Sequence, residues 1–212
     1  MLYPKKNEPE LSQELFRNPG CEYRGTPFWA WNCKLEEEEL LRQLEVMKKM
    51  GFGGAHMHVR TGMATPYLSD EHMDLIRACV DKCKEENMLA WLYDEDRWPS
   101  GAAGGLVTKD KRFRKKSVVF TRIKKEDATD PITGYNEGRP YLLAVYDVCL
   151  SETGELDSYS RINEDADAKG FKLYAYVVAD KNSGWYNNQA YIDTLDKEAM
   201  KRFIDITYEA YN

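Results

Sequence analysis

Three consecutive carboxylates followed by an arginine and a tryptophan make Asp94–Trp98 the segment with the most chemically capable side chains. Carboxylates supply the acid, base or nucleophile that cleavage of a glycosidic bond requires. An aromatic ring packs on the apolar face of a sugar, while charged groups hydrogen-bond its hydroxyls. The segment therefore predicts a sugar site, with Glu95 or Asp96 favoured as the catalytic acid and Asp94 as a third candidate.

Further candidate residues lie at the ends of two earlier apolar segments. Trp31 and Asn32 end the first segment, and His56, His58 and Arg60 alternate along the second. Alternate residues of a strand share one face, so these three side chains are expected to point the same way. The predicted substrate-binding residues are Trp31, Asn32, His56, His58, Arg60, Arg97 and Trp98.

Two other chemistries compete for the same residues. The pair His56 and His58 on one strand is typical of the metal ligands of amidohydrolase-type barrels. The chain holds one further histidine, His72, and no second set of ligands, so we predict no metal. The glycine-rich loop Gly101–Gly105 lacks the Lys-Ser/Thr of a phosphate loop, and we predict no cofactor.

The elements that must position these residues alternate between strand and helix. Short aromatic or apolar runs predict strands at 26–32, 53–60 and 89–94, and three- and four-residue spacing of apolar side chains predicts helices at 35–50 and 70–87. Alternating strands and helices indicate a parallel sheet, whose ligands bind where the strands end. If residues 94–96 continue the third strand, Asp94 and Asp96 share one face and Glu95 lies on the other.

The second half of the chain has a different pattern. Segments rich in β-branched and aromatic residues follow one another from Ser117 to Asp180, separated by polar turns such as 130–138 and 164–170. Without helices between them, these segments predict an antiparallel β subdomain. Residues 189–193 are expected to form one more short strand, and Asp196 to cap a final helix with an apolar stripe at Met200, Phe203 and Thr207.

Composition narrows the class of protein. The 212 residues carry a formal net charge of −6, which argues against a nucleic-acid partner, and the basic run Lys109–Lys116 is expected to be a solvated connection. We expect no membrane span and no signal peptide. Five cysteines without a CxxC spacing predict free thiols, with Cys79 and Cys83 buried, and a cytoplasmic location.

Several segments together resemble a known family. TPFWAWN (26–32), EEELLRQLEVMKKMGFGG (37–54), HMHVRTGMATPYLSDEHMDLIR (56–77) and WLYDEDRWPSGAAGG (91–105) resemble the N-terminal part of a (β/α)8 barrel of bacterial glycoside hydrolases. These hydrolases are related to family 106, the α-L-rhamnosidase-like group. YIDTLDKEAMKRFIDITYEAY (191–211) resembles the segment of that group that leads from an inserted β subdomain back to the barrel.

The resemblance implies an α/β fold, a partial TIM-type (β/α) barrel with an inserted antiparallel β subdomain. It divides the chain into an N-terminal extension (1–25), three βα units (26–112), the β subdomain (113–188) and a returning strand and helix (189–212). A full barrel needs about 250 residues, so we expect an incomplete N-terminal portion of a hydrolase that lacks part of the active site.

An unpaired barrel edge further predicts a homo-oligomer. The alternative functions are a non-catalytic carbohydrate-binding or assembly module and the metal-dependent barrel that uses His56 and His58.

Overall fold

The computed structural model describes residues 10, 12–130 and 138–212. It divides into two compact units, one formed by residues up to Ser100 together with Thr207–Asn212 and the other by Gly101–Ile206. The predicted N-terminal extension therefore lies partly outside the described residues, and so does the predicted turn 130–138. Most contacts of each unit lie within that unit.

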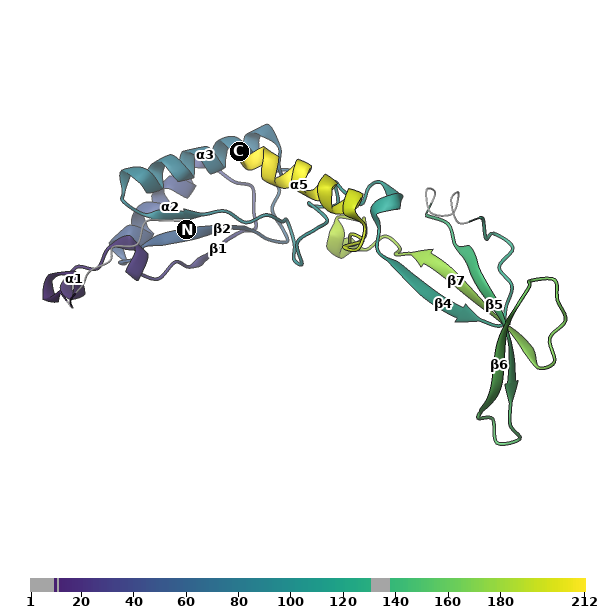
Figure 1. Cartoon of the computed structure of the whole chain (residues 1–212). Coiled ribbons are helices and arrows are strands. Elements are labelled where there is room, and N and C mark those ends of the chain that lie inside the picture. Colours follow the sequence, from purple (N-terminus) through teal and green to yellow (C-terminus); the bar gives the residue numbers. More distant parts are fainter. Residues whose placement is uncertain (1–9, 11, 131–137) are drawn as a thin grey trace. The chain divides into compact units, whose positions relative to one another are not determined.

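The first unit contains an open parallel sheet of three strands. Strands β1 (Phe28–Trp31), β2 (Gly54–Val59) and β3 (Leu89–Trp91) pair in the order β1-β2-β3. Helices α2 (Glu37–Lys49) and α3 (Asp70–Glu85) connect them and lie on one face of the sheet (Figure 1). The described residues form no closed barrel, and the mixed α/β class predicted from the alternation is confirmed.

The apolar core of this unit fills the space between the sheet and its two helices. Alternation along β1 turns Trp29 and Trp31 toward the helices, where they join buried residues of β2, α2 and α3, among them Met57, Leu44 and Cys79. The same alternation turns Phe28 and Ala30 to the other face of the sheet. His56 of β2, which pairs with Phe28, lies on that face too. Parallel sheets usually carry helices on both faces. In the described residues α2 and α3 cover only one face, so the other face is available for a binding site.

The ends of α2 and α3 follow the usual capping rules. Ser69 caps α3 by accepting a hydrogen bond of 3.2 Å from the His72 backbone N–H. Gly51 follows α2 with a φ of +90°, a left-handed backbone conformation that residues with a Cβ rarely adopt. A short helix α1 (Gln13–Arg17) and a 3-10 turn η1 (Cys21–Tyr23) precede the sheet.

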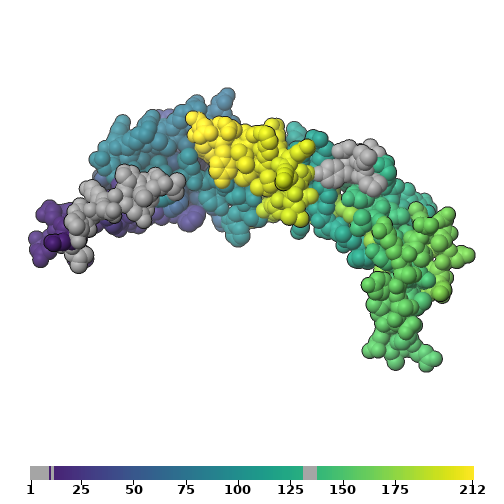
Figure 2. Space-filling view, viewed as in Figure 1, coloured from purple at the N-terminus to yellow at the C-terminus, as the bar shows by residue number. Residues whose placement is uncertain are grey.

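The second unit is built on an antiparallel sheet in the order β4-β7-β5-β6. Its strands are β4 (Lys116–Thr121), β5 (Tyr141–Leu150), β6 (Leu156–Ile162) and β7 (Phe171–Ala179). The predicted antiparallel sheet is confirmed, but β6 was not predicted because its sequence, LDSYSRI, is polar. The surface of β6 is exposed along most of the strand (Figure 2).

Residues 189–193 do not form the short strand that we expected. Among the described residues, Gln189 and Ile192 form only isolated bridges, with Ser183 and Arg114 respectively. The final helix α5 (Lys197–Tyr211) begins as predicted, with Asp196 Oδ1 accepting a hydrogen bond of 2.9 Å from the Glu198 N–H. Two 3-10 turns, η2 (Lys111–Phe113) and η3 (Gly184–Tyr186), complete this unit.

The basic run is solvated at Lys109, Lys111 and Lys115, as its composition suggested, but not at Arg114. Arg114 is buried, and its guanidinium donates to the Thr108 carbonyl at 2.9 Å, Asn182 Oδ1 at 2.7 Å and Gln189 Oε1 at 2.8 Å. Three neutral acceptors thus hold a buried cation within the second unit, where it joins segments up to 75 residues apart. Within the part of the chain described here, no helix has both the length and the apolar character needed to cross a membrane.

Candidate functional site

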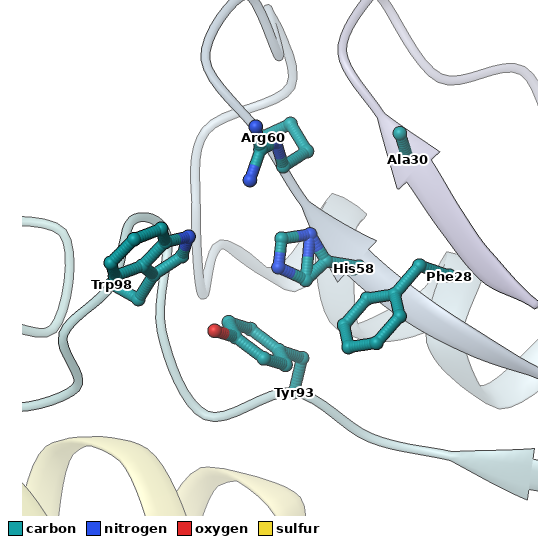
Figure 3. Close-up of a pocket in the computed structure, with 6 residues that line it drawn as sticks. All are labelled: Phe28, Ala30, His58, Arg60, Tyr93 and Trp98. Atoms are coloured by element: carbon teal, nitrogen blue, oxygen red, sulfur yellow. The ribbon is translucent and has the colours of Figure 1, made fainter.

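The first unit contains a pocket of about 440 Å³ on the sheet face that α2 and α3 leave uncovered. Six residues line it, and Figure 3 shows their side chains arranged around a common space: Phe28, Ala30, His58, Arg60, Tyr93 and Trp98. They come from β1, from β2 and from the segments that follow β2 and β3. The pocket therefore lies toward the carboxyl ends of parallel strands, the position at which ligands bind in such sheets.

Strand register explains why these residues meet. Phe28 pairs with His56 and Ala30 with His58, so the lining residues of β1 and β2 share one face. Arg60 follows β2, and its backbone N–H donates to the Trp31 carbonyl at 2.9 Å. This bond extends the β1–β2 pairing by one residue and fixes the backbone from which the Arg60 side chain starts.

Aromatic contacts form the wall of the pocket. The His58 ring lies 4.0 Å from the Tyr93 ring, centroid to centroid, and 5.1 Å from the Phe28 ring, which it meets edge-on. Burial and the nearby Arg60 charge lower the pKa of His58, so its imidazole is neutral at pH 7. The Trp98 side chain is 55% exposed and presents its indole to the same space.

The acidic segment after β3 lies beside the pocket lining rather than in it. Because β3 ends at Trp91, strand alternation does not set the directions of residues 94–96, and the prediction that Asp94 and Asp96 share a strand face was wrong. Asp94 accepts hydrogen bonds from the Tyr208 hydroxyl at 2.7 Å and from Ser100 Oγ at 2.6 Å.

The other two carboxylates are buried. Glu95 is 0% exposed, and its Oε1 accepts a hydrogen bond of 2.9 Å from the Asp96 backbone N–H. Asp96 Oδ2 lies 3.4 Å from Arg97 Nε, an ion pair shielded from solvent. Charge from Asp94 and Glu95 contributes to raising the pKa of the pocket residue Tyr93, after the larger effect of burial, which places both carboxylates within electrostatic range of the pocket.

The structure brings together three of the predicted binding residues, His58, Arg60 and Trp98. Trp31 requires correction: it is 1% exposed and packs edge-on against Trp29 in the core, so it is not a surface on which a sugar stacks. Asn32 is exposed outside the lining, and Arg97 contacts Asp96.

His56 also lies outside the lining. Its ring stacks between two others, with Phe28 at 5.0 Å and Trp91 at 5.4 Å. This arrangement gives the imidazole a packing role across all three strands. Over the residues that the structure describes, no group of three or more His, Cys, Asp or Glu side chains is placed to hold a metal ion.

Sequence reasoning missed two kinds of functional residue. Phe28 and Tyr93 line the pocket. Phe28 could have been found, because it lies on the predicted first strand with an aromatic side chain, whereas Tyr93 follows the end of β3, where alternation gives no direction. Tyr208 and Tyr211 contact the segment after β3, and Tyr211 donates to the Tyr93 carbonyl at 3.0 Å. No local signal connects these two tyrosines to a segment more than a hundred residues earlier.

Comparison with known proteins gives limited matches. No family model and no curated protein matches the chain. A solved structure to which the chain is similar is the rhamnosidase from Novosphingobium sp. PP1Y, with 17% sequence identity and a TM-score of 0.47. The aligned region covers 69% of this chain and 17% of that one, so the chain spans about a sixth of the length of that rhamnosidase.

Proposed function

We propose that the pocket binds a sugar ring and that the chain is part of a glycoside hydrolase, with the parallel sheet as the first strands of a (β/α) barrel. The observation that carries this proposal is the pocket itself. Aromatic rings from Phe28, Tyr93 and Trp98 surround a space that also receives a guanidinium and an imidazole. Its volume of about 440 Å³ lies within the usual range for small-molecule sites.

The chemistry of a sugar matches this lining. The apolar faces of a pyranose pack against aromatic rings, and its hydroxyls hydrogen-bond to side chains such as Arg60 and His58. Hydrolysis additionally needs a carboxyl group near the scissile bond, and glycoside hydrolases use a pair of them. Glu95, Asp96 and Asp94 are the candidates in this chain for one member of the pair.

A second function, sugar binding without catalysis, is favoured by one specific observation. All three carboxylates lie outside the pocket lining. Asp94 accepts a hydrogen bond from Tyr208, and Asp96 forms an ion pair with Arg97. A binding module needs the aromatic pocket and no free carboxylate. The two functions therefore share the pocket and differ in what the acidic segment does.

Binding is tested by isothermal titration of the 212-residue chain with a panel of methyl glycosides. We expect Trp98→Ala to weaken binding at least tenfold, because it removes the exposed ring of the pocket. The matched control is Trp185→Ala, which removes a similarly exposed indole from the other unit and should leave binding unchanged. Equal affinities for wild type and Trp98→Ala would reject the pocket as the sugar site.

Catalysis is tested by turnover of aryl glycosides with the single variants Glu95→Gln, Asp96→Asn and Asp94→Asn. Loss of turnover in one variant, with its binding of the methyl glycoside retained, would identify the catalytic carboxylate. Binding by the wild type without any turnover would favour the binding module.

A further inference from the structure

We infer that the sugar this pocket takes is acidic, a uronic acid whose carboxylate binds Arg60. This inference rests on the proposed function and names the substrate class of the same site. It is carried by the state of the Arg60 guanidinium and by the hydrogen-bonding character of the other pocket residues.

Arg60 is an exposed cation without an anion of its own. Within the described part of the chain, its guanidinium makes no ion pair and no hydrogen bond, although its backbone is fixed by the Trp31 carbonyl. Two other exposed arginines of this acidic chain are neutralised by a carboxylate three residues away, Arg42 by Glu39 and Arg77 by Asp74. Arg60 differs from them and points into the pocket (Figure 3).

Two carboxylates of the acidic segment after β3 do not supply the missing charge. Asp94 is held by Tyr208 and Ser100, Asp96 is paired with Arg97, and neither lines the pocket. The positive charge of Arg60 therefore stands beside three aromatic side chains and a neutral imidazole, without a counter-charge in the lining. An anionic ligand group would complete the site.

The remaining polar groups of the lining favour the same ligand. The Trp98 indole and the Arg60 guanidinium, with its five N–H groups, only donate hydrogen bonds, whereas the Tyr93 hydroxyl and the neutral His58 can each donate and accept. No carboxylate or amide side chain lines the pocket. Tyr93 and His58 can therefore serve the ring hydroxyls, while the guanidinium, which only donates, suits a carboxylate, to which it binds through two parallel bonds.

The experiment compares matched neutral and acidic sugars on the full chain. The titrants are methyl glucoside with methyl glucuronide, and methyl galactoside with methyl galacturonide, which differ only at C6. We expect at least one uronide to bind ten or more times more tightly than its neutral partner at low salt. Because Arg60 is exposed to solvent, this preference should shrink as sodium chloride is raised.

Variants assign the preference to one residue. Arg60→Gln should reduce uronide affinity at least tenfold and neutral-sugar affinity by a smaller factor, so that the ratio of the two affinities falls toward one, whereas Arg60→Lys should keep part of the preference. Arg77→Gln is the control, since it removes an exposed arginine of α3 that pairs with Asp74, outside the pocket. Thermal melts establish that each variant is folded before it is titrated.

Each outcome decides a different point. Neutral and acidic partners that bind equally, with Trp98→Ala weakening both, would overturn the acidic-sugar inference and leave the proposed function standing. Acetate that competes as well as the uronide would also overturn the inference, since the site would then recognise a carboxylate without a sugar. Failure of every glycoside to bind would overturn the proposed function itself.

Discussion

The Tyr208 hydroxyl donates a hydrogen bond of 2.7 Å to Asp94 Oδ2 and thereby connects the last turns of α5 to the segment that follows β3. The Tyr211 hydroxyl makes a second connection, at 3.0 Å, to the Tyr93 carbonyl. Two phenols thus hold the short segment that carries both a pocket residue and the first of the three candidate carboxylates. The contacts bridge 114 and 118 residues of sequence.

Removal of one phenol hydroxyl tests this connection. We expect Tyr208→Phe to lower the free energy of unfolding by about 1 kcal/mol, because it deletes a hydrogen bond to a charged but partly solvated carboxylate. The measurement is urea denaturation at pH 7. Tyr159→Phe on β6 is the control, since that exposed tyrosine makes no side-chain hydrogen bond to the described residues. Equal losses in the two variants would show that the Asp94 contact contributes nothing specific.

Acid should destabilise the first unit through His72. This histidine is fully buried, its Nδ1 accepts a hydrogen bond of 3.2 Å from the Leu68 N–H, and burial lowers its pKa to about 4. Because the unfolded chain binds the proton near pH 6.5 and the folded chain does not, stability is lost as the pH falls from about 6.5 to about 4. The shift corresponds to at most about 3 kcal/mol.

The pH dependence is isolated by comparison with His72→Asn, which keeps an acceptor in place of Nδ1 but does not titrate. Urea denaturation of both proteins from pH 7.5 to pH 4 should show a steeper loss for the wild type. Parallel curves would mean that His72 has the same pKa in the folded and the unfolded chain, and would contradict the prediction.

Thiol reactivity should separate the cysteines by burial. Cys79 and Cys83 are buried free thiols, as predicted, and burial raises their pKa values to about 12 and about 11, whereas Cys33 is exposed. Thiolate is the reactive form, so an aromatic disulfide reagent at pH 8 should modify Cys33 rapidly and the buried pair only after unfolding. Cys33→Ser should remove the fast phase, and a fast phase that survives this change would contradict the assignment.

Phe203 should be essential to the second unit. Its side chain is 5% exposed and packs with five other buried apolar residues, among them Val107, Phe113 and Ile192. Phe203→Ala should lower the free energy of unfolding by about 3–5 kcal/mol, the usual effect of such a cavity. Ile204→Ala, at a neighbouring exposed position, should change it by less than about 1 kcal/mol. Similar losses from both would contradict the described packing.

The burial of Phe203 and Thr207 changes which surface we expect to mediate self-association. The apolar stripe of α5 does not offer a free surface, because Phe203 and Thr207 are already buried within the chain. Self-association stays a prediction and now concerns β1 and β3, the two edges of the parallel sheet, with Phe28 exposed beside them. Sedimentation at micromolar concentration should show a dimer or larger species, and a stable monomer would reject it.

Much of the fold could be predicted because it depends on local patterns. The helices α2 and α3 follow from apolar spacing and from signals at their ends, such as Ser69 and Gly51. The directions of the carboxylates could not be predicted, since β3 is only three residues long and the segment after it is held by Tyr208 and Tyr211. Trp31 shows the same limit, because period-two alternation places it on one face without showing which face is the core.

The division of the chain into units has a consequence for the order of folding during synthesis. The first unit is completed by Thr207–Asn212, which a ribosome adds only after the whole second unit has been made. The three parallel strands therefore leave the exit tunnel before the two tyrosines that hold the segment after β3. Nascent chains should show the second unit folding as a continuous segment, while the site segment of the first stays incompletely held until translation reaches the last turn of α5.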